Sequence, residues 1–116
     1  MAGNRCSIYL FFIITMKRYE ITYTAQAQWD IFELSHYIAY EIMMPLTAER
    51  YRQGLVNTID RLAYLPKLHA VSDIERVQRR YGPCARTVCY KKMTVIYNVV
   101  GETVVIRRVL AGKLLF

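Results

Sequence analysis

The chain has 116 residues, of which 54% are hydrophobic and 22% charged, and it carries a formal net charge of +7. A chain of this length forms one domain with its own core, and this composition excludes a disordered, collagen-like or low-complexity protein. Residues 1–65 balance six cations with six anions, whereas residues 66–116 hold ten cations and three anions, so the second half favours a polyanionic partner, either nucleic acid or an acidic protein segment.

The first 15 residues contain an apolar run of seven residues, Ile8–Ile14. This run is too short to span a bilayer, which takes about 20 residues, and no small-residue cleavage site of a signal peptide follows it. Met16 resembles an ordinary cytosolic start, and every pattern described below comes after it. We therefore predict that residues 1–15 are a non-native or dispensable extension and that residues 16–116 form a single domain.

A short strand and an amphipathic helix are expected first. Tyr19–Tyr23 alternates aromatic and β-branched residues, which is typical of a strand, and Thr24 can cap a helix that starts at Ala25. The acidic residues of this helix lie mostly off its apolar face, and Pro45 is expected to stop it. The apolar face comprises Ala27, Ile31, Leu34, Ile38 and Ile42.

A second helix is predicted after this proline, with Thr47 as its N-cap and Pro66 at its end. The connection between the two helices is short, so they form an antiparallel hairpin. We expect Tyr37 and Tyr40 to be half-buried and Trp29, the single tryptophan, to pack at the boundary between helix and sheet. The apolar face of the second helix comprises Ala48, Tyr51, Leu55, Ile59, Leu62 and Leu65.

The last third of the chain predicts three strands, after a loop of partial order over residues 67–85. Ser72–Tyr81 can hold a helical turn in this loop. The strands cover residues 86–90, 93–100 and 103–110, and Gly101 suits the first central position of a type II′ turn. The order strand–helix–helix–three strands predicts an α+β fold, with the helical hairpin on one face of a small antiparallel sheet.

The three cysteines, Cys6, Cys84 and Cys89, do not suggest a disulfide framework, because their number is odd. No histidine lies close enough in sequence to complete a zinc set, so we predict no metal and no cofactor. We expect buried or half-buried free thiols in a reducing cytosol. His36 and His69 are expected at the surface or its boundary rather than in a catalytic site.

A set of short patterns follows in a fixed order along the chain. They are Tyr19-Glu20-Ile21, Ala25-x-Ala27-x-x-Asp30-Ile31, Tyr37-Ile38-Ala39, Ala48-x-x-Tyr51, Ile59-x-x-Leu62, Leu65-Pro66, Arg86-x-x-x-Tyr90, Val95-Ile96-Tyr97-x-Val99, Val105-Ile106-x-Arg108-Val109-Leu110 and Gly112-Lys113. This ordered set resembles the RelE/ParE superfamily of type II toxin–antitoxin toxins, over about residues 18–113. The resemblance implies a bacterial or plasmid-borne cytoplasmic toxin that inhibits growth and stabilises plasmids, with no membrane contact. It also implies a small, acidic cognate antitoxin, with operator DNA contacted only through the toxin–antitoxin complex.

The target differs between the two branches of this superfamily. ParE-like members bind and poison DNA gyrase, whereas RelE-like members are metal-independent endoribonucleases that cleave mRNA on the ribosome. Cleavage without a metal needs several cations and an acid–base group around the scissile phosphate. Here Thr94 stands where RelE-like chains have a basic residue, and the chain ends at Phe116 without their terminal tyrosine. Only Arg86 and Lys113 remain as candidate catalytic phosphate contacts.

The helical hairpin and these departures favour the ParE-like branch. A histidine or arginine that ParE-like chains often carry near the exit of the last strand is absent as well, so the target stays open between gyrase and ribosome. A small basic nucleic-acid-binding domain is a further alternative, since such domains interleave aromatic and cationic residues on an open sheet.

Binding of the antitoxin or the target is expected on the basic half of the chain. Strand alternation predicts that Arg107 and Arg108 lie on opposite faces, and Arg108 is the one expected to face the partner. Apolar side chains of the antitoxin are expected to enter near Trp29. The candidate binding residues are Arg79, Arg80, Arg86, Arg107, Arg108, Lys113 and Trp29.

Overall fold

The computed structural model describes residues 18–112, so the predicted extension of residues 1–15, Cys6 and Lys113 lie outside the described part of the chain. The order of elements is the predicted one, and the helical turn expected before the last three strands is a short helix. The elements are β1 (Glu20–Tyr23), α2 (Ala25–His36) continued by a π-helical turn (Tyr37–Glu41), α3 (Pro45–Asp60) continued by a 3-10 turn (Arg61–Ala63), a second 3-10 turn (Pro66–Leu68), α4 (Glu75–Tyr81), β2 (Arg86–Tyr90), β3 (Met93–Val100) and β4 (Thr103–Ala111).

The sheet has four strands in the order β1-β4-β3-β2. Two hairpins join β2 to β3 and β3 to β4, and Gly101 in the second has φ of 60°, as the first position of a type II′ turn requires. β1 lies at an edge, as expected, but it pairs with β4 in parallel. The α+β fold is therefore confirmed, with a sheet that is mixed rather than wholly antiparallel.

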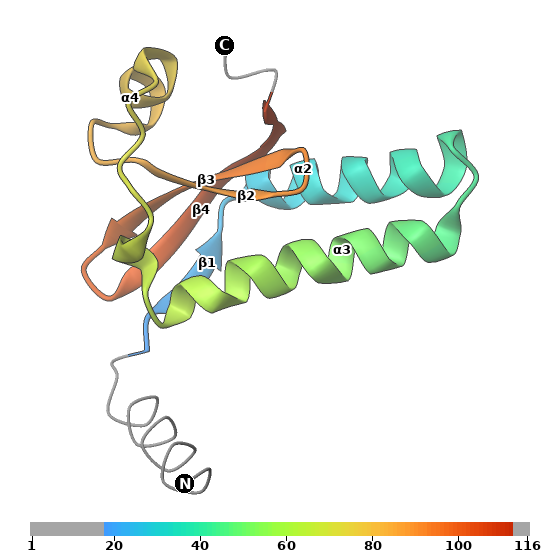
Figure 1. The fold of residues 1–116 in the computed structure, drawn as a ribbon, viewed down its shortest axis with the longest axis horizontal. Helices are drawn as coiled ribbons and strands as arrows, with labels where there is room; N and C mark the ends of the chain where they lie inside the picture. The colour runs from blue at the N-terminus through green and yellow to red at the C-terminus, as the bar shows by residue number, and fades with distance from the viewer. Residues whose placement is uncertain (1–17, 113–116) are drawn as a thin grey trace, which may run out of the picture.

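The helical hairpin covers one face of this sheet and projects beyond it (Figure 1). The end of the hairpin where α2 begins and α3 ends supplies the core, and its closing loop points away from the strands. Ile31, Leu34 and Val99 lie at the margin of this core, whereas Ile38 is buried outside it. The core comprises Ala27, Leu55, Ile59, Leu62, Val88, Val95, Tyr97, Val104, Ile106 and Val109.

A smaller apolar cluster occupies the opposite face of the sheet. Ile96 points away from the main core, because its neighbours Val95 and Tyr97 point into it. Val77 of α4 and Ala85 cover Ile96 completely. The predicted helical turn in residues 72–81 is thus confirmed as α4, and its packing against the sheet explains why this segment is ordered.

Pro45 acts differently from the prediction. Pro45 was expected to stop the first helix, but it occupies the first turn of α3, where its missing N–H leaves no hydrogen bond unmade. The first helical segment ends instead before Met43, whose φ of 61° is left-handed. Since α3 already starts at Pro45, Thr47 is not its cap. The cap of α2 is confirmed, because the Thr24 hydroxyl accepts a hydrogen bond from the Ala27 N–H at 3.1 Å.

Several side chains are more exposed than expected. Tyr37 and Tyr40 are 55% and 69% exposed rather than half-buried. Cys84 and Cys89 are exposed free cysteines rather than buried thiols. The helical positions of both tyrosines face solvent because the outer half of the hairpin extends past the sheet, which the periodicity alone does not show. Among residues 18–112, no helix is long and apolar enough to cross a membrane.

Candidate functional site

A basic groove lies where α2 begins, beside the last strand and the end of α4. We define this basic groove by the residues that line a cavity of about 280 Å³, namely Thr24, Gln26, Arg80, Tyr81, Arg107 and Arg108. Three of the six residues are arginines, and they come from two elements separated by the whole β2–β3 hairpin. The groove thus concentrates the charge that the sequence places in its second half.

A β-bulge brings Arg107 and Arg108 to the same groove. In the antiparallel register of β3 and β4, Ile96 faces Arg108 and Tyr97 faces Ile106, so Arg107 is the extra residue. A bulge breaks the strict alternation of side chains along a strand. The prediction that these two arginines lie on opposite faces is therefore wrong, because that prediction assumed a regular strand.

The bulge is tied to the start of α2 by Thr24. Its backbone N–H donates to the carbonyl of Ile106 at 3.0 Å, and its hydroxyl donates to the carbonyl of Arg107 at 3.0 Å. The same hydroxyl oxygen accepts from the Ala27 N–H as the helix cap. One side chain thus fixes the helix start and satisfies a carbonyl of the bulge, which holds the groove in one geometry.

Arg108 is anchored by a carboxylate that the sequence analysis did not single out as a site residue. Its guanidinium donates to both carboxylate oxygens of Asp30, at 2.8 Å and 3.2 Å, and the Val109 N–H donates to the same carboxylate at 3.0 Å. The Asp30 side chain is only 7% exposed. Hydrogen bonding to Asp30 is the main cause that raises the pKa of Arg108, against burial that lowers it, and the Tyr81 side chain adds to the rise.

Arg80 and Arg107 supply the charge that the groove can offer to a ligand. Neither forms a salt bridge with a carboxylate within residues 18–112. The Arg107 guanidinium lies over the Tyr81 ring, 5.8 Å from its centroid, so the ring holds it without neutralising it. The groove therefore presents the guanidinium groups of Arg80 and Arg107, neither of which is paired with a carboxylate among the described residues. Asp30 holds the third arginine, Arg108, in place.

A comparison with protein families decides the class of this chain. Residues 21–114 match the family model described as "ParE toxin of type II toxin-antitoxin system, parDE". The chain belongs to this family of ParE toxins. It is a ParE-type toxin of a type II toxin–antitoxin system and a member of the RelE/ParE superfamily, as the ordered patterns indicated. The preference for the ParE-like branch is also confirmed.

Two solved structures share the fold of this ParE toxin. A chain of the chromosomal ParDE toxin–antitoxin system from P. aeruginosa superimposes with a TM-score of 0.63 at 18% identity, covering 82% of this chain and 97% of that chain. A chain of the toxin–antitoxin complex RelBE2 from Mycobacterium tuberculosis gives a TM-score of 0.57 at 20% identity, covering 84% and 94%. At these identities the likeness concerns the fold. No curated protein sequence matches the toxin.

Other predicted site residues of the ParE toxin lie away from the basic groove. Arg79 is next to Arg80 on α4, but it forms an exposed ion pair with Glu75 and does not line the groove. Trp29 is 53% exposed on α2 and stacks on Phe32, so the prediction that it packs at the helix–sheet boundary is wrong. The helical period places Trp29 on the face of α2 opposite to Ala27 and Ile31, which pack into the core. Lys113 lies outside the described residues.

Arg86 does not line the basic groove but binds backbone carbonyls of the segment between α3 and α4. Its guanidinium donates to the carbonyl of His69 at 2.6 Å and to that of Lys67 at 3.3 Å. Tyr97 is the cross-strand neighbour of Arg86 on β3. The hydroxyl of this buried tyrosine donates to the carbonyl of Pro66 at 2.6 Å. Burial raises the pKa of Tyr97 to about 12, against the nearby Arg86, which lowers it. These contacts fix the connection between α3 and α4.

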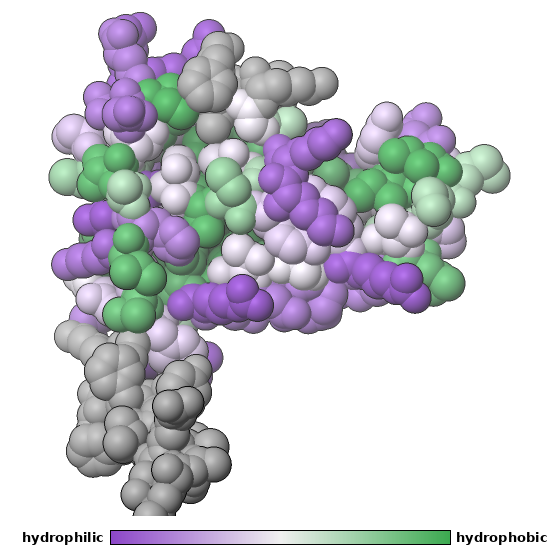
Figure 2. Space-filling view, viewed as in Figure 1, coloured by the Kyte–Doolittle hydropathy of each residue, from purple (hydrophilic) through white to green (hydrophobic). Residues whose placement is uncertain are grey.

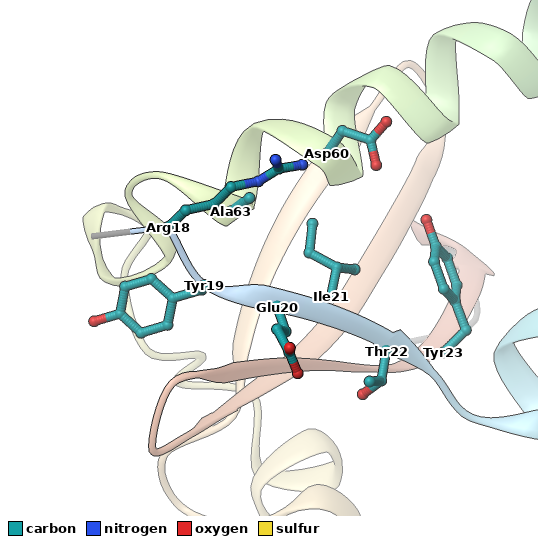
Figure 3. Close-up of a pocket in the computed structure, with 8 residues that line it drawn as sticks. All are labelled: Arg18, Tyr19, Glu20, Ile21, Thr22, Tyr23, Asp60 and Ala63. Atoms are coloured by element: carbon teal, nitrogen blue, oxygen red, sulfur yellow. The ribbon is translucent and has the colours of Figure 1, made fainter. Parts of the chain in front are cut away.

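A further cavity, of about 510 Å³, runs along β1 (Figure 3). Ile21 and Tyr23 point toward the side of β1 where α3 ends, while Glu20 and Thr22 point to the other side. Burial and the nearby carboxylate of Asp60 raise the pKa of Tyr23. The lining mixes one arginine with two carboxylates, so it does not favour an ion of either sign.

Proposed function

We propose that this ParE toxin acts by binding rather than by catalysis, that it inhibits DNA gyrase, and that an acidic segment of its cognate antitoxin neutralises it through the basic groove. The observation that carries the proposal is that Arg80 and Arg107 line one groove with Tyr81 and with the anchored Arg108. The family description and the two toxin–antitoxin systems of the same fold support an antitoxin partner.

The groove is better suited to bind an anion than to cleave RNA. Cleavage of RNA needs a group that takes the proton of the ribose 2′-hydroxyl. No histidine lines the groove among the described residues, and the carboxylate of Asp30 already accepts hydrogen bonds from Arg108 and from the Val109 N–H. Guanidinium groups that are held in place still provide strong, charge-assisted hydrogen bonds to carboxylates. This favours a ParE-like binding protein over a RelE-like endonuclease.

Charge also favours an acidic antitoxin segment as the ligand of the groove. An antitoxin segment that is disordered when free must offset the loss of its own conformational freedom on binding. Opposite charges on a preformed surface speed the encounter and select the partner. The groove is preformed, because Thr24 and the Asp30–Arg108 pair fix its walls in the free toxin.

A matched pair of variants tests the groove. Arg80→Glu and Arg107→Glu should each weaken the complex with the cognate antitoxin by about ten-fold or more and flatten its salt dependence, since fewer ion pairs remain to be screened. Arg79→Glu makes the same charge change one residue away from Arg80, outside the groove, and should leave the affinity nearly unchanged. Equal effects of Arg79→Glu and Arg80→Glu in a titration would show that only the net charge matters.

The target is tested with purified components. The toxin should inhibit DNA supercoiling by gyrase, and addition of the antitoxin should reverse this inhibition. Failure to inhibit gyrase, together with cleavage of mRNA on purified ribosomes, would assign this chain to the alternative function of a ribosome-dependent endonuclease.

A further inference from the structure

The outer face of α2 carries an unbroken row of aromatic side chains. Trp29 stacks on Phe32 with ring centroids 5.5 Å apart, Phe32 lies 5.9 Å from His36, and His36 lies 4.5 Å from Tyr40. Steps of three and four residues place these rings on one helix face. We call these four residues the aromatic ridge.

The aromatic ridge has no packing role within the described chain. Trp29, Phe32 and Tyr40 are 53%, 56% and 69% exposed, and none belongs to either apolar cluster of the fold. The apolar surface continues onto the closing loop of the hairpin, where Figure 2 shows hydrophobic residues gathered at the end away from the sheet. These exposed residues are Ile42, Met43, Met44 and Leu46. A contiguous apolar surface with a polar rim marks an interaction site.

Two shallow grooves flank the aromatic ridge, and one of them has an acidic rim formed by Glu33 and Glu41. One, of about 480 Å³, is lined by Trp29, Phe32 and His36 of the ridge together with Glu33, Tyr37 and Glu41. The other, of about 360 Å³, runs between the ridge and the start of α3 and includes Glu49, whose carboxylate is paired with Arg52. No lysine or arginine is among the described residues that line either groove. This rim has the opposite sign to the basic groove.

We propose that the aromatic ridge docks a protein segment whose apolar side chains are flanked by lysines or arginines. Exposed tryptophan and tyrosine are the side chains that most often anchor protein interfaces. A lysine or arginine beside the apolar side chains of the partner can be attracted by the carboxylates of Glu33 and Glu41. It can also form cation–π contacts with the aromatic rings. This partner differs in charge from the acidic segment assigned to the basic groove.

The charge of the rim favours a basic, apolar segment over two other occupants, an acidic segment and a second copy of the chain. An acidic segment would meet the carboxylates of Glu33 and Glu41 with like charge, which disfavours it. A second copy of the chain, docked ridge against ridge about a two-fold axis, would bring the same glutamates of both copies into one interface. A basic, apolar segment is the occupant that the rim favours.

A pair of synthetic peptides tests the proposal directly. One peptide is a helix former with leucines on one face and lysines flanking them, and its control has glutamate in place of every lysine. Trp29 is the only tryptophan of the chain and lies within the ridge, so its fluorescence reports docking at this place. We expect the lysine peptide to shift the Trp29 emission and to bind about ten-fold tighter than the glutamate peptide. Because the chain carries a net charge of +7, attraction by net charge alone predicts the opposite order.

Charge-swapped variants complete the test. Glu33→Lys combined with Glu41→Lys should reverse the preference between the two peptides. Glu20→Lys combined with Asp73→Lys makes the same change in net charge at exposed positions away from the ridge and should leave the preference unchanged. Equal binding of both peptides, or no change in Trp29 emission with either, overturns the proposal. Dimerisation of the toxin that Phe32→Glu abolishes would identify the ridge as a contact between copies and overturn it as well.

Discussion

Asp30 of α2 and Arg108 of β4 are 78 positions apart in the sequence and joined by two hydrogen bonds, at 2.8 Å and 3.2 Å. Their pairing fixes the helical hairpin to the bulged end of the last strand. Because Asp30 also accepts from the Val109 N–H, it serves the backbone of the sheet as well as the arginine. The fold and the basic groove therefore depend on the same carboxylate.

Removing this carboxylate should destabilise the toxin strongly. Asp30→Ala leaves the Arg108 guanidinium and the Val109 N–H without their partner, and we expect a loss of about 3 kcal/mol in the free energy of unfolding. Glu33→Ala removes an exposed carboxylate from the same helix and should cost less than about 0.5 kcal/mol. Urea unfolding of both variants measures the difference, and equal losses would show that the pair contributes nothing specific.

The sequence predicted the elements well because their periodicity is local. The steps of three and four residues in α2 and α3, and the alternation in β3, are fixed by residues close in sequence. Pro45 was misplaced because a proline is compatible with the end of one helix and with the first turn of the next. Asp30 is part of the family pattern Ala25-x-Ala27-x-x-Asp30-Ile31. Composition and periodicity, however, did not predict that it pairs with Arg108.

The candidate site was predicted less completely, because it depends on the bulge in β4. Alternation assigns Arg107 and Arg108 to opposite faces of the sheet. No pattern in residues 103–111 predicts the bulge at Arg107. Trp29 is exposed because it lies on the face of α2 opposite to the core residue Ala27. Residue type and charge pointed to the basic half of the chain, but which of its arginines share one groove could be seen only in the structure.

A close contact between α3 and β2 gives a second prediction. A Cβ atom at Gly54 would lie 2.0 Å from the hydroxyl oxygen of Tyr90. In an open helix Gly→Ala stabilises by about 1 kcal/mol, but here the Tyr90 ring must move away and lose its contact with Tyr51. We expect Gly54→Ala to destabilise the wild-type toxin and to stabilise the Tyr90→Ala variant. A double-mutant cycle from thermal unfolding measures this, and the same sign in both backgrounds would contradict the contact.

The buried Tyr97 predicts a dependence of stability on high pH. Its pKa is raised to about 12 in the folded toxin, against about 10 for an ordinary tyrosine, so the unfolded chain releases this proton first. The stability that Tyr97 contributes is therefore complete below pH 10 and is lost as the pH rises toward 12, by about 2–3 kcal/mol. Tyr97→Phe should be less stable at pH 8 because the bond to Pro66 is lost, but its stability should fall less steeply between pH 10 and 12. Parallel pH profiles of the two proteins would contradict this assignment.

The extension ahead of Met16 gives a further prediction. Every pattern of the toxin fold begins at Tyr19 or later, so a chain that begins at Met16 should melt within a few degrees of the full chain. The measurement is thermal unfolding followed by circular dichroism. A loss of several kcal/mol on removal of residues 1–15 would mean that the apolar run contributes to the core.

The central claim, that this ParE toxin poisons gyrase, is tested most directly by inducing the toxin alone in bacterial cells and following DNA synthesis and protein synthesis separately. The account predicts that DNA synthesis falls first while translation continues, and that co-expression of the antitoxin restores growth. An early stop of translation with DNA synthesis still running would contradict it and would point to the ribosome as the target.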